Sequence, residues 1–140
     1  MAQPSRVRSL LAALLVGTAT GALLLGVGGR PVMRAFALAT GRPPGFSFGG
    51  TFSIILSGAI AGFVGGMLLF AAARFVPARL PFRGLIFGLL CYVLATPGFR
   101  PPHLLVFALF APTFLAYGVA TVMLHERFAR VAGFSHADPR

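Results

Sequence analysis

The chain has 140 residues, of which 57% are hydrophobic and 10% are charged. Water-soluble domains have roughly 25% charged residues, so this chain has too few polar side chains to cover a core in water. Its basic residues are twelve arginines, which with two acids give a net charge of +10. Because the arginines lie at the edges of apolar runs and in connectors, rather than in a polar stripe, we expect no nucleic-acid partner.

Four apolar runs predict four membrane-crossing helices, at about 10–28, 52–73, 84–99 and 104–124. A crossing helix needs about 20 residues, with a range near 17–25. The third run is short, with Arg83 near its start and Pro97 near its end, and it can cross if Arg83 snorkels to the headgroups. Residues 52–73 lack the alternation of barrel strands. The sequence therefore predicts an all-α membrane protein: one domain, a four-transmembrane-helix bundle with a cytoplasmic tail at 125–140.

The first run has an alternative interpretation as a secretory signal. It follows Arg6 and Arg8, and the small residues Ala19, Thr20 and Gly21 could form a cleavage site. Signal sequences have apolar cores of about 7–15 residues, whereas this run continues past that site to Val27. An uncleaved helix is the favoured prediction, and cleavage stays open as the alternative.

The distribution of arginines predicts the orientation of the chain. If the N-terminus is cytoplasmic, eight arginines face the cytoplasm and four face outside, namely Arg30, Arg34, Arg42 and Arg100. Cytoplasmic segments of membrane proteins carry the excess of basic residues. We therefore expect a multi-pass membrane protein with both termini in the cytoplasm.

Glycines at four-residue spacing predict close contacts between helices. Residues four apart lie on one face of a helix, and small residues let helix backbones approach closely in lipid. The glycines with this spacing are Gly17 and Gly21, then Gly58, Gly62 and Gly66, then Gly84 and Gly88. The pattern does not say whether the contact is within the chain or between chains, and the high glycine content is a simpler explanation of it.

The loop between the first two runs is predicted to contain a further, short helix. Pro31 suits the first turn of a helix, Gly41 suits its end and Pro43 prevents its continuation. The Gly28-Gly29 and Gly49-Gly50 pairs indicate breaks on either side of this loop. A helix over about 31–40 spans only half of a bilayer core, so we expect it to be interfacial or re-entrant.

Three arginines of this loop form the candidate binding site of the sequence. Arg30 and Arg34 are four apart and point the same way, and Arg42 follows. The next helix is expected to begin with Thr51 or Ser53 as its cap, and a helix N-terminus beside glycine-rich backbone favours anions. The hypothesis is a site for an anionic lipid phosphate or a carboxylate. The alternative is that these arginines contact ordinary headgroups.

The loop also supports a resemblance. Its sequence resembles small uncharacterised multi-pass membrane proteins of GC-rich bacteria in three consecutive features. These are the run Arg30-x-x-Met33-Arg34, residues 41–51 (Gly-Arg-Pro-Pro-Gly-Phe-Ser-Phe-Gly-Gly-Thr) and the glycine-striped helix that follows. The resemblance covers residues 28–66. It implies a bacterial membrane location, which we expect to be the cytoplasmic (inner) membrane, and no particular chemistry.

The spans contain no acid, and proton and cation pathways usually depend on acids or histidines in the membrane. The acids Glu126 and Asp138 and the histidines His103, His125 and His136 do not combine into a metal-binding or catalytic motif. We therefore expect no enzymatic activity, no metal and no cofactor. Tyr92 and Tyr117 lie within spans, and each needs a hydrogen-bond partner there.

The leading hypothesis is a small non-enzymatic membrane protein that acts by helix packing with the lipid bilayer, with a copy of itself or with a membrane protein partner. Two alternatives stay open. One is a transporter or channel component, in which the face of Ser53 and Ser57 would line a pore of an oligomer. The other is an accessory subunit of a membrane enzyme complex.

Overall fold

The computed structural model describes residues 4–43, 45, 47–72, 80–98 and 104–131. All regular structure within these residues is helical, which confirms the all-α prediction and fits four apolar helices. The α-helices are α1 (Pro4–Thr20), α2 (Gly29–Ala39), α3 (Phe48–Ala72), α4 (Leu80–Ala95) and α5 (Leu104–Val131). A π-helical segment (Gly21–Val27) follows α1, and a 3-10 turn (Thr96–Gly98) follows α4.

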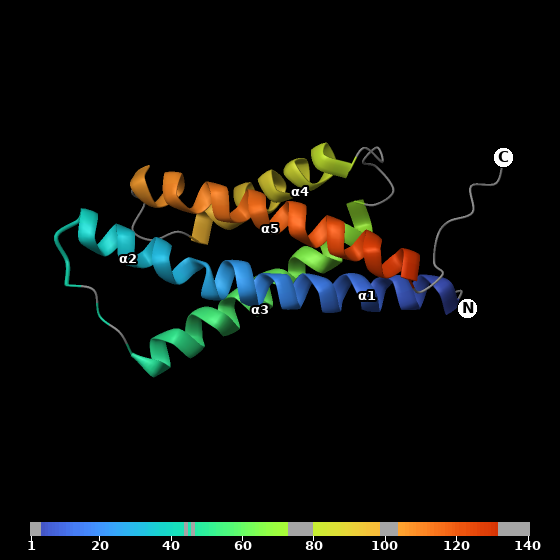
Figure 1. The fold of residues 1–140 in the computed structure, drawn as a ribbon, viewed down its shortest axis with the longest axis horizontal. Helices are drawn as coiled ribbons and strands as arrows, with labels where there is room; N and C mark the ends of the chain where they lie inside the picture. The colour runs from blue at the N-terminus through green and yellow to red at the C-terminus, as the bar shows by residue number, and fades with distance from the viewer. Residues whose placement is uncertain (1–3, 44, 46, 73–79, 99–103, 132–140) are drawn as a thin grey trace.

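The first helix does not break at Gly28-Gly29, so that part of the sequence prediction is wrong. The chain passes from α1 through the π-helical segment into α2 as one long run (Figure 1). Gly28 has helical angles (φ −64°, ψ −25°), and its N–H donates to the carbonyl of Leu23 at 2.9 Å. In apolar surroundings a break would leave backbone groups without partners, so the chain keeps its helical hydrogen bonds here.

The end of α2 follows the prediction from Gly41. This residue has φ +67°, a left-handed conformation in which glycine has no steric penalty. The N–H of Gly41 donates to the carbonyl of Leu38 at 3.2 Å, and that of Arg42 donates to the carbonyl of Ala37 at 2.9 Å. This is the Schellman arrangement, which satisfies the last carbonyls of the helix. The predicted short helix is therefore present as α2, but it extends the first span instead of standing apart from it.

Helix α3 begins one turn earlier than expected. Ser47, and not Thr51 or Ser53, caps it: the Ser47 hydroxyl accepts the N–H of Gly50 at 3.1 Å. Gly49 and Gly50 therefore lie inside the first turn of α3 and do not break it. The early start of α3 has a local cause. The serine side chain accepts the otherwise unpaired N–H three residues later, and this bond stabilises the first turn even though it contains two glycines.

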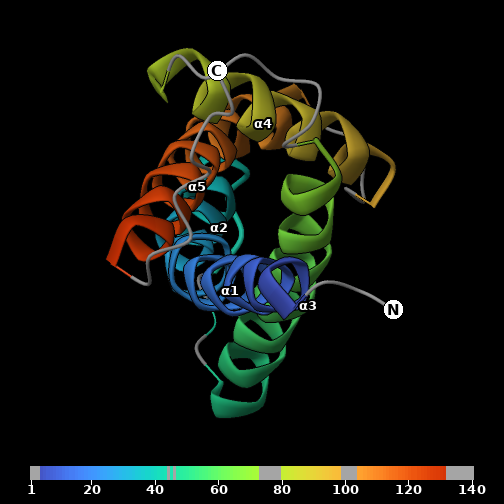
Figure 2. The same cartoon turned by 90° about the vertical axis from the view of Figure 1, so that its right-hand side faces the viewer.

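The helices are arranged side by side in the order α3, α1, α5, α4, which is visible along the bundle (Figure 2). Helix α1 packs against α3 and α5, and α4 packs against α5. Among the described residues, the backbones of α3 and α4 hardly approach each other, although side chains of both helices enter one buried cluster. The buried core lies where α3, α4 and α5 converge and consists of Leu69, Phe87, Cys91, Phe114, Tyr117 and Val122.

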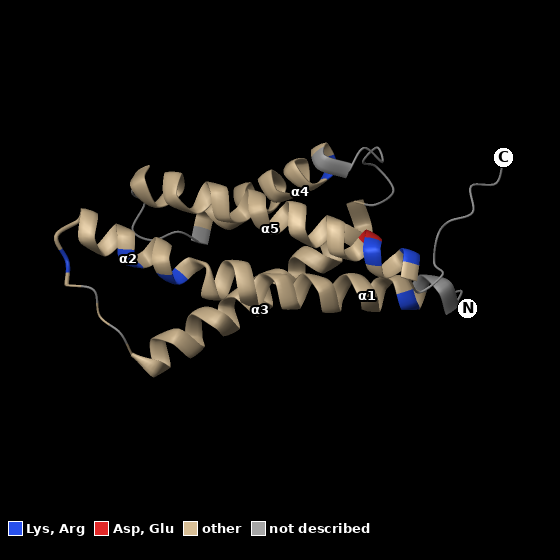
Figure 3. Ribbon diagram, in the orientation of Figure 1, with Lys and Arg blue, Asp and Glu red and all other residues tan. Residues whose placement is uncertain are grey.

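Three segments are long and apolar enough to cross a membrane, by length and composition: Val7–Ala39, Phe48–Ala72 and Leu104–Val131. Helix α4 is also apolar but has only 16 residues, or about 24 Å. Large apolar side chains cover the outside of the bundle, including Leu15 (71% exposed), Phe52 (69%) and Phe82 (69%). Charged residues lie toward the two ends of the long axis, with uncharged helix between them (Figure 3).

Candidate functional site

A very close contact joins α1, together with the π-helical segment that follows it, to α3 through their glycines. Gly17 and Gly21 lie directly against Gly58, Gly62 and Gly66. A Cβ atom on Gly62 would lie 2.2 Å from the carbonyl oxygen of Gly17, and one on Gly21 would lie 2.5 Å from the Cα of Gly62. Only hydrogen fits at this distance, so the two backbones touch. The contact lies within the chain. The glycine spacing alone had left open whether these five residues contact the same chain or another one.

A second glycine contact joins α4 to α5. A Cβ on Gly84 would lie 2.7 Å from the Cα of Val119, and one on Gly88 would lie 2.6 Å from the carbonyl oxygen of Phe114. The partner that sequence reasoning missed is Gly118, whose Cβ would lie 2.4 Å from the Cα of Gly88. Gly118 has no second glycine four residues away, so spacing could not reveal it.

Buried hydroxyl groups connect three helices at the centre of the bundle. The hydroxyl oxygens of Thr20 on α1 and Thr121 on α5 are 2.8 Å apart and share a hydrogen bond. One turn earlier on α5, the Tyr117 hydroxyl donates to the carbonyl of Gly62 on α3 at 3.3 Å. Thr121 and Tyr117 are at most 1% exposed. Since the polar groups bond to protein atoms, this cluster holds α1, α3 and α5 together.

The hydroxyl of the other tyrosine, Tyr92, also has a hydrogen-bond partner. The hydroxyl of Tyr92 on α4 donates to the carbonyl of Phe107 on α5 at 2.9 Å. The ring of Tyr92 lies edge-on to that of Phe114, with centroids 5.8 Å apart. Sequence reasoning required partners for both tyrosines, but it could not name the carbonyls that accept them.

A cavity of about 200 Å³ opens between α3 and α4, which we call the α3–α4 seam. Ala61 and Gly65 line it from α3, and Cys91 and Ala95 line it from α4, with Tyr117 of α5 at its floor. Each of these two pairs has a spacing of four residues. The seam is therefore bordered on both sides by small residues. Gly65 packs against the Tyr117 side chain of α5 and Cys91 belongs to the buried core, so the part of the seam that stays exposed is formed by Ala61, Val64 and Leu94.

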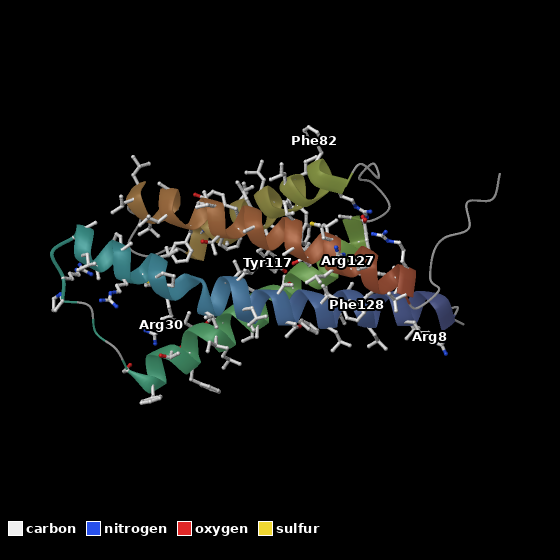
Figure 4. The ribbon with its side chains drawn as sticks, in the orientation of Figure 1. Arg8, Arg30, Phe82, Tyr117, Arg127 and Phe128 are labelled. Carbon is white, nitrogen blue, oxygen red and sulfur yellow. The ribbon has the colours of Figure 1, made fainter. Side chains whose placement is uncertain are left out.

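The predicted arginine site is only partly assembled. Arg30 turns toward the start of α3, where its guanidinium donates to the carbonyl of Ser47 at 3.2 Å and to the hydroxyl of Thr51 (Figure 4). Arg34 lies on the exposed surface of α2, and Arg42 lies exposed just after it. Arg30 thus joins α2 to α3, and the contacts of its guanidinium are with protein acceptors.

At the opposite end of the bundle, Arg83 of α4 and Glu126 of α5 form an ion pair with a nitrogen–oxygen distance of 3.6 Å. Among the described residues, no group of three histidine, cysteine, aspartate or glutamate side chains could hold a metal ion. Ser53 and Ser57, the residues of the pore alternative, are exposed on α3 and away from the bundle centre.

Comparison with protein-family models, curated proteins and solved structures finds no match to this chain. Fold and site thus define a class only: an all-α bundle of apolar helices held by glycine contacts, with a seam between α3 and α4. The resemblance to small bacterial membrane proteins stays a prediction.

Proposed function

We propose that this chain is a non-enzymatic accessory protein of the bacterial cytoplasmic membrane, and that its α3–α4 seam receives the transmembrane helix of a partner protein. The observation that supports this proposal is the open seam itself. Among the described residues, three of the four side-by-side backbone contacts of a four-helix ring are made, and the fourth, between α3 and α4, is nearly absent.

The residues that border the seam suit a helix better than a lipid chain. In membranes, small residues spaced by four mark the faces where helices approach closely, because lipid gives no hydrophobic drive and close packing must supply the attraction. Within this chain, the glycine faces with that spacing are covered by another helix. The pairs Ala61 with Gly65 and Cys91 with Ala95 have the same spacing at the seam. Ala61 is exposed there, whereas Gly65 and Cys91 are buried against core side chains.

The transport alternative receives less support. A polar path needs hydroxyl or charged groups that face water or an open channel. The hydroxyls of Thr20, Thr121 and Tyr117 are instead buried and bonded to protein atoms. A flux assay in liposomes is the direct check on this alternative, and a specific flux would favour it over the accessory role.

Photo-crosslinking in the membranes of the source organism tests the proposal. A photoreactive phenylalanine analogue replaces Val64 or Leu94, which both line the seam and are 49% and 56% exposed. The matched control is Leu89, on the opposite face of α4 and 54% exposed. We expect one protein adduct of defined mass from Val64 and from Leu94, and none from Leu89.

The variant Ala95→Phe fills the seam and should abolish the adduct while far-UV circular dichroism stays unchanged. An adduct with twice the mass of the chain would show that a second copy, and not a different protein, occupies the seam. Lipid adducts alone, or equal labelling from Leu89, would refute the proposal.

A further inference from the structure

A second hollow lies between α1 and α5, across the bundle from the seam. It is an open groove of about 510 Å³, within the roughly 300–1,000 Å³ of sites for small molecules. Its wall on α1 includes Leu11, Leu15 and Ala19, each four residues after the last, with Ala12 and Val16 beside them. Phe128 of α5 forms part of its other side. Among the described residues that line the groove, Arg8 alone is charged, and it lies at the end of the groove (Figure 4).

The length of this groove matches one leaflet of a bilayer. Arg8 and Ala19 are eleven positions apart on a helix, which corresponds to about 16 Å at 1.5 Å per residue. Half of a bilayer core is about 15 Å thick. With Arg8 at the level of the headgroups, the apolar wall of the groove would therefore reach about to the bilayer centre. These dimensions match a single acyl chain below its headgroup.

The charge at this end of the bundle favours an anionic headgroup. Arg8, Arg127 and Arg130 are exposed here. Glu126 is the one acid among the described residues, and it is already paired with Arg83. Arg8 therefore has no carboxylate of the described chain to neutralise it, whereas a phosphate in the headgroup of an anionic lipid would do so.

We propose that the α1–α5 groove binds an anionic phospholipid, with one acyl chain along Leu11, Leu15 and Ala19 and the phosphate at Arg8. This site is separate from the seam and does not depend on the proposed partner helix. It also differs from the loop site at Arg30, whose guanidinium contacts α3.

Fluorescence quenching can test this site because the chain contains no tryptophan. The variant Leu15→Trp places a single fluorophore in the groove, at a side chain that is 71% exposed. The matched control is Ile86→Trp, which lies on α4 toward the same end of the bundle, is 52% exposed and is near the neutralised Arg83–Glu126 pair. Each variant is reconstituted in vesicles with phosphatidylglycerol or phosphatidylcholine whose acyl chains are brominated.

At Leu15→Trp we expect phosphatidylglycerol to bind about fivefold more strongly than phosphatidylcholine, the ratio typical for one cation near a membrane surface. At Ile86→Trp the ratio should be near one. Adding Arg8→Gln to Leu15→Trp should abolish the preference, and Arg8→Lys should restore most of it.

Equal quenching by the two lipids at Leu15→Trp would overturn the proposal. So would a preference of the same size at Ile86→Trp, which would indicate general enrichment of anionic lipid, or a preference that survives Arg8→Gln. If Leu15→Trp does not fold, Leu11→Trp provides a second reporter, since Leu11 also lines the groove and is 53% exposed.

Discussion

Adding one methyl group at Gly62 should separate α1 from α3. The new Cβ would lie 2.2 Å from the carbonyl oxygen of Gly17 and 2.8 Å from the Cα of Gly21. Ordinary contact begins near 3.4 Å, so the helices must move apart by about 1.2 Å. Both obstacles are backbone atoms, so no side chain can rotate away. Gaps of roughly 0.5–1 Å already forfeit a quarter to a half of the dispersion energy at each contact.

Overpacking of this kind costs about 2–3 kcal/mol, near the upper end of its usual range. Alanine also has a better helix propensity than glycine by about 0.8–1 kcal/mol. The free energy of unfolding of Gly62→Ala should therefore fall by about 1–2 kcal/mol in net terms. Gly49→Ala on the same helix is the control, because no atom lies within 4 Å of its added Cβ and only the propensity gain applies.

The assay is reversible unfolding by SDS in mixed lipid micelles, followed by far-UV circular dichroism. The difference in unfolding free energy between the two alanine variants removes the propensity contribution and should be about 2–3 kcal/mol. If Gly62→Ala and Gly49→Ala unfold within about 0.5 kcal/mol of each other, α1 and α3 do not touch through these glycines, and the reasoning fails.

Three further outcomes are expected. In a double-mutant cycle of Thr20→Val with Thr121→Val, the coupling free energy should be about 0.6–1.7 kcal/mol, the range for hydrogen bonds between membrane helices. Zero coupling would contradict the hydrogen bond between the two hydroxyls, whose oxygens are 2.8 Å apart. Arg30→Ala should speed amide hydrogen exchange in the first turn of α3 by about tenfold or more, since hydrogen bonds of charged groups contribute about 1.5–3 kcal/mol. Exchange in α4 is the internal control, and an unchanged exchange rate in the first turn of α3 would show that Arg30 does not stabilise that turn. Reporter fusions at Pro43 should read outside the cytoplasm and fusions at Ala78 inside, and a cytoplasmic Pro43 would reverse the orientation inferred from the arginines.

Much of this protein follows from local properties of its sequence. Runs of apolar residues without acids predicted the helices, because each helix satisfies its own backbone hydrogen bonds wherever water is scarce. Gly41 predicted the end of α2, since a left-handed residue at that point satisfies the last carbonyls. The spacing of Gly58, Gly62 and Gly66 marked a face for close contact, because the helical repeat places residues four apart on one side.

The tertiary structure alone decided which faces meet. Nothing local pairs Gly62 with Gly17, or Gly88 with Gly118, because the choice depends on how whole surfaces fit together. It also decided where the helices are continuous: the chain stays helical through Gly28, and Ser47 caps α3 because its hydroxyl reaches the N–H of Gly50. The two hollows arise in the same way, since a seam and a groove exist only between helices that are already packed.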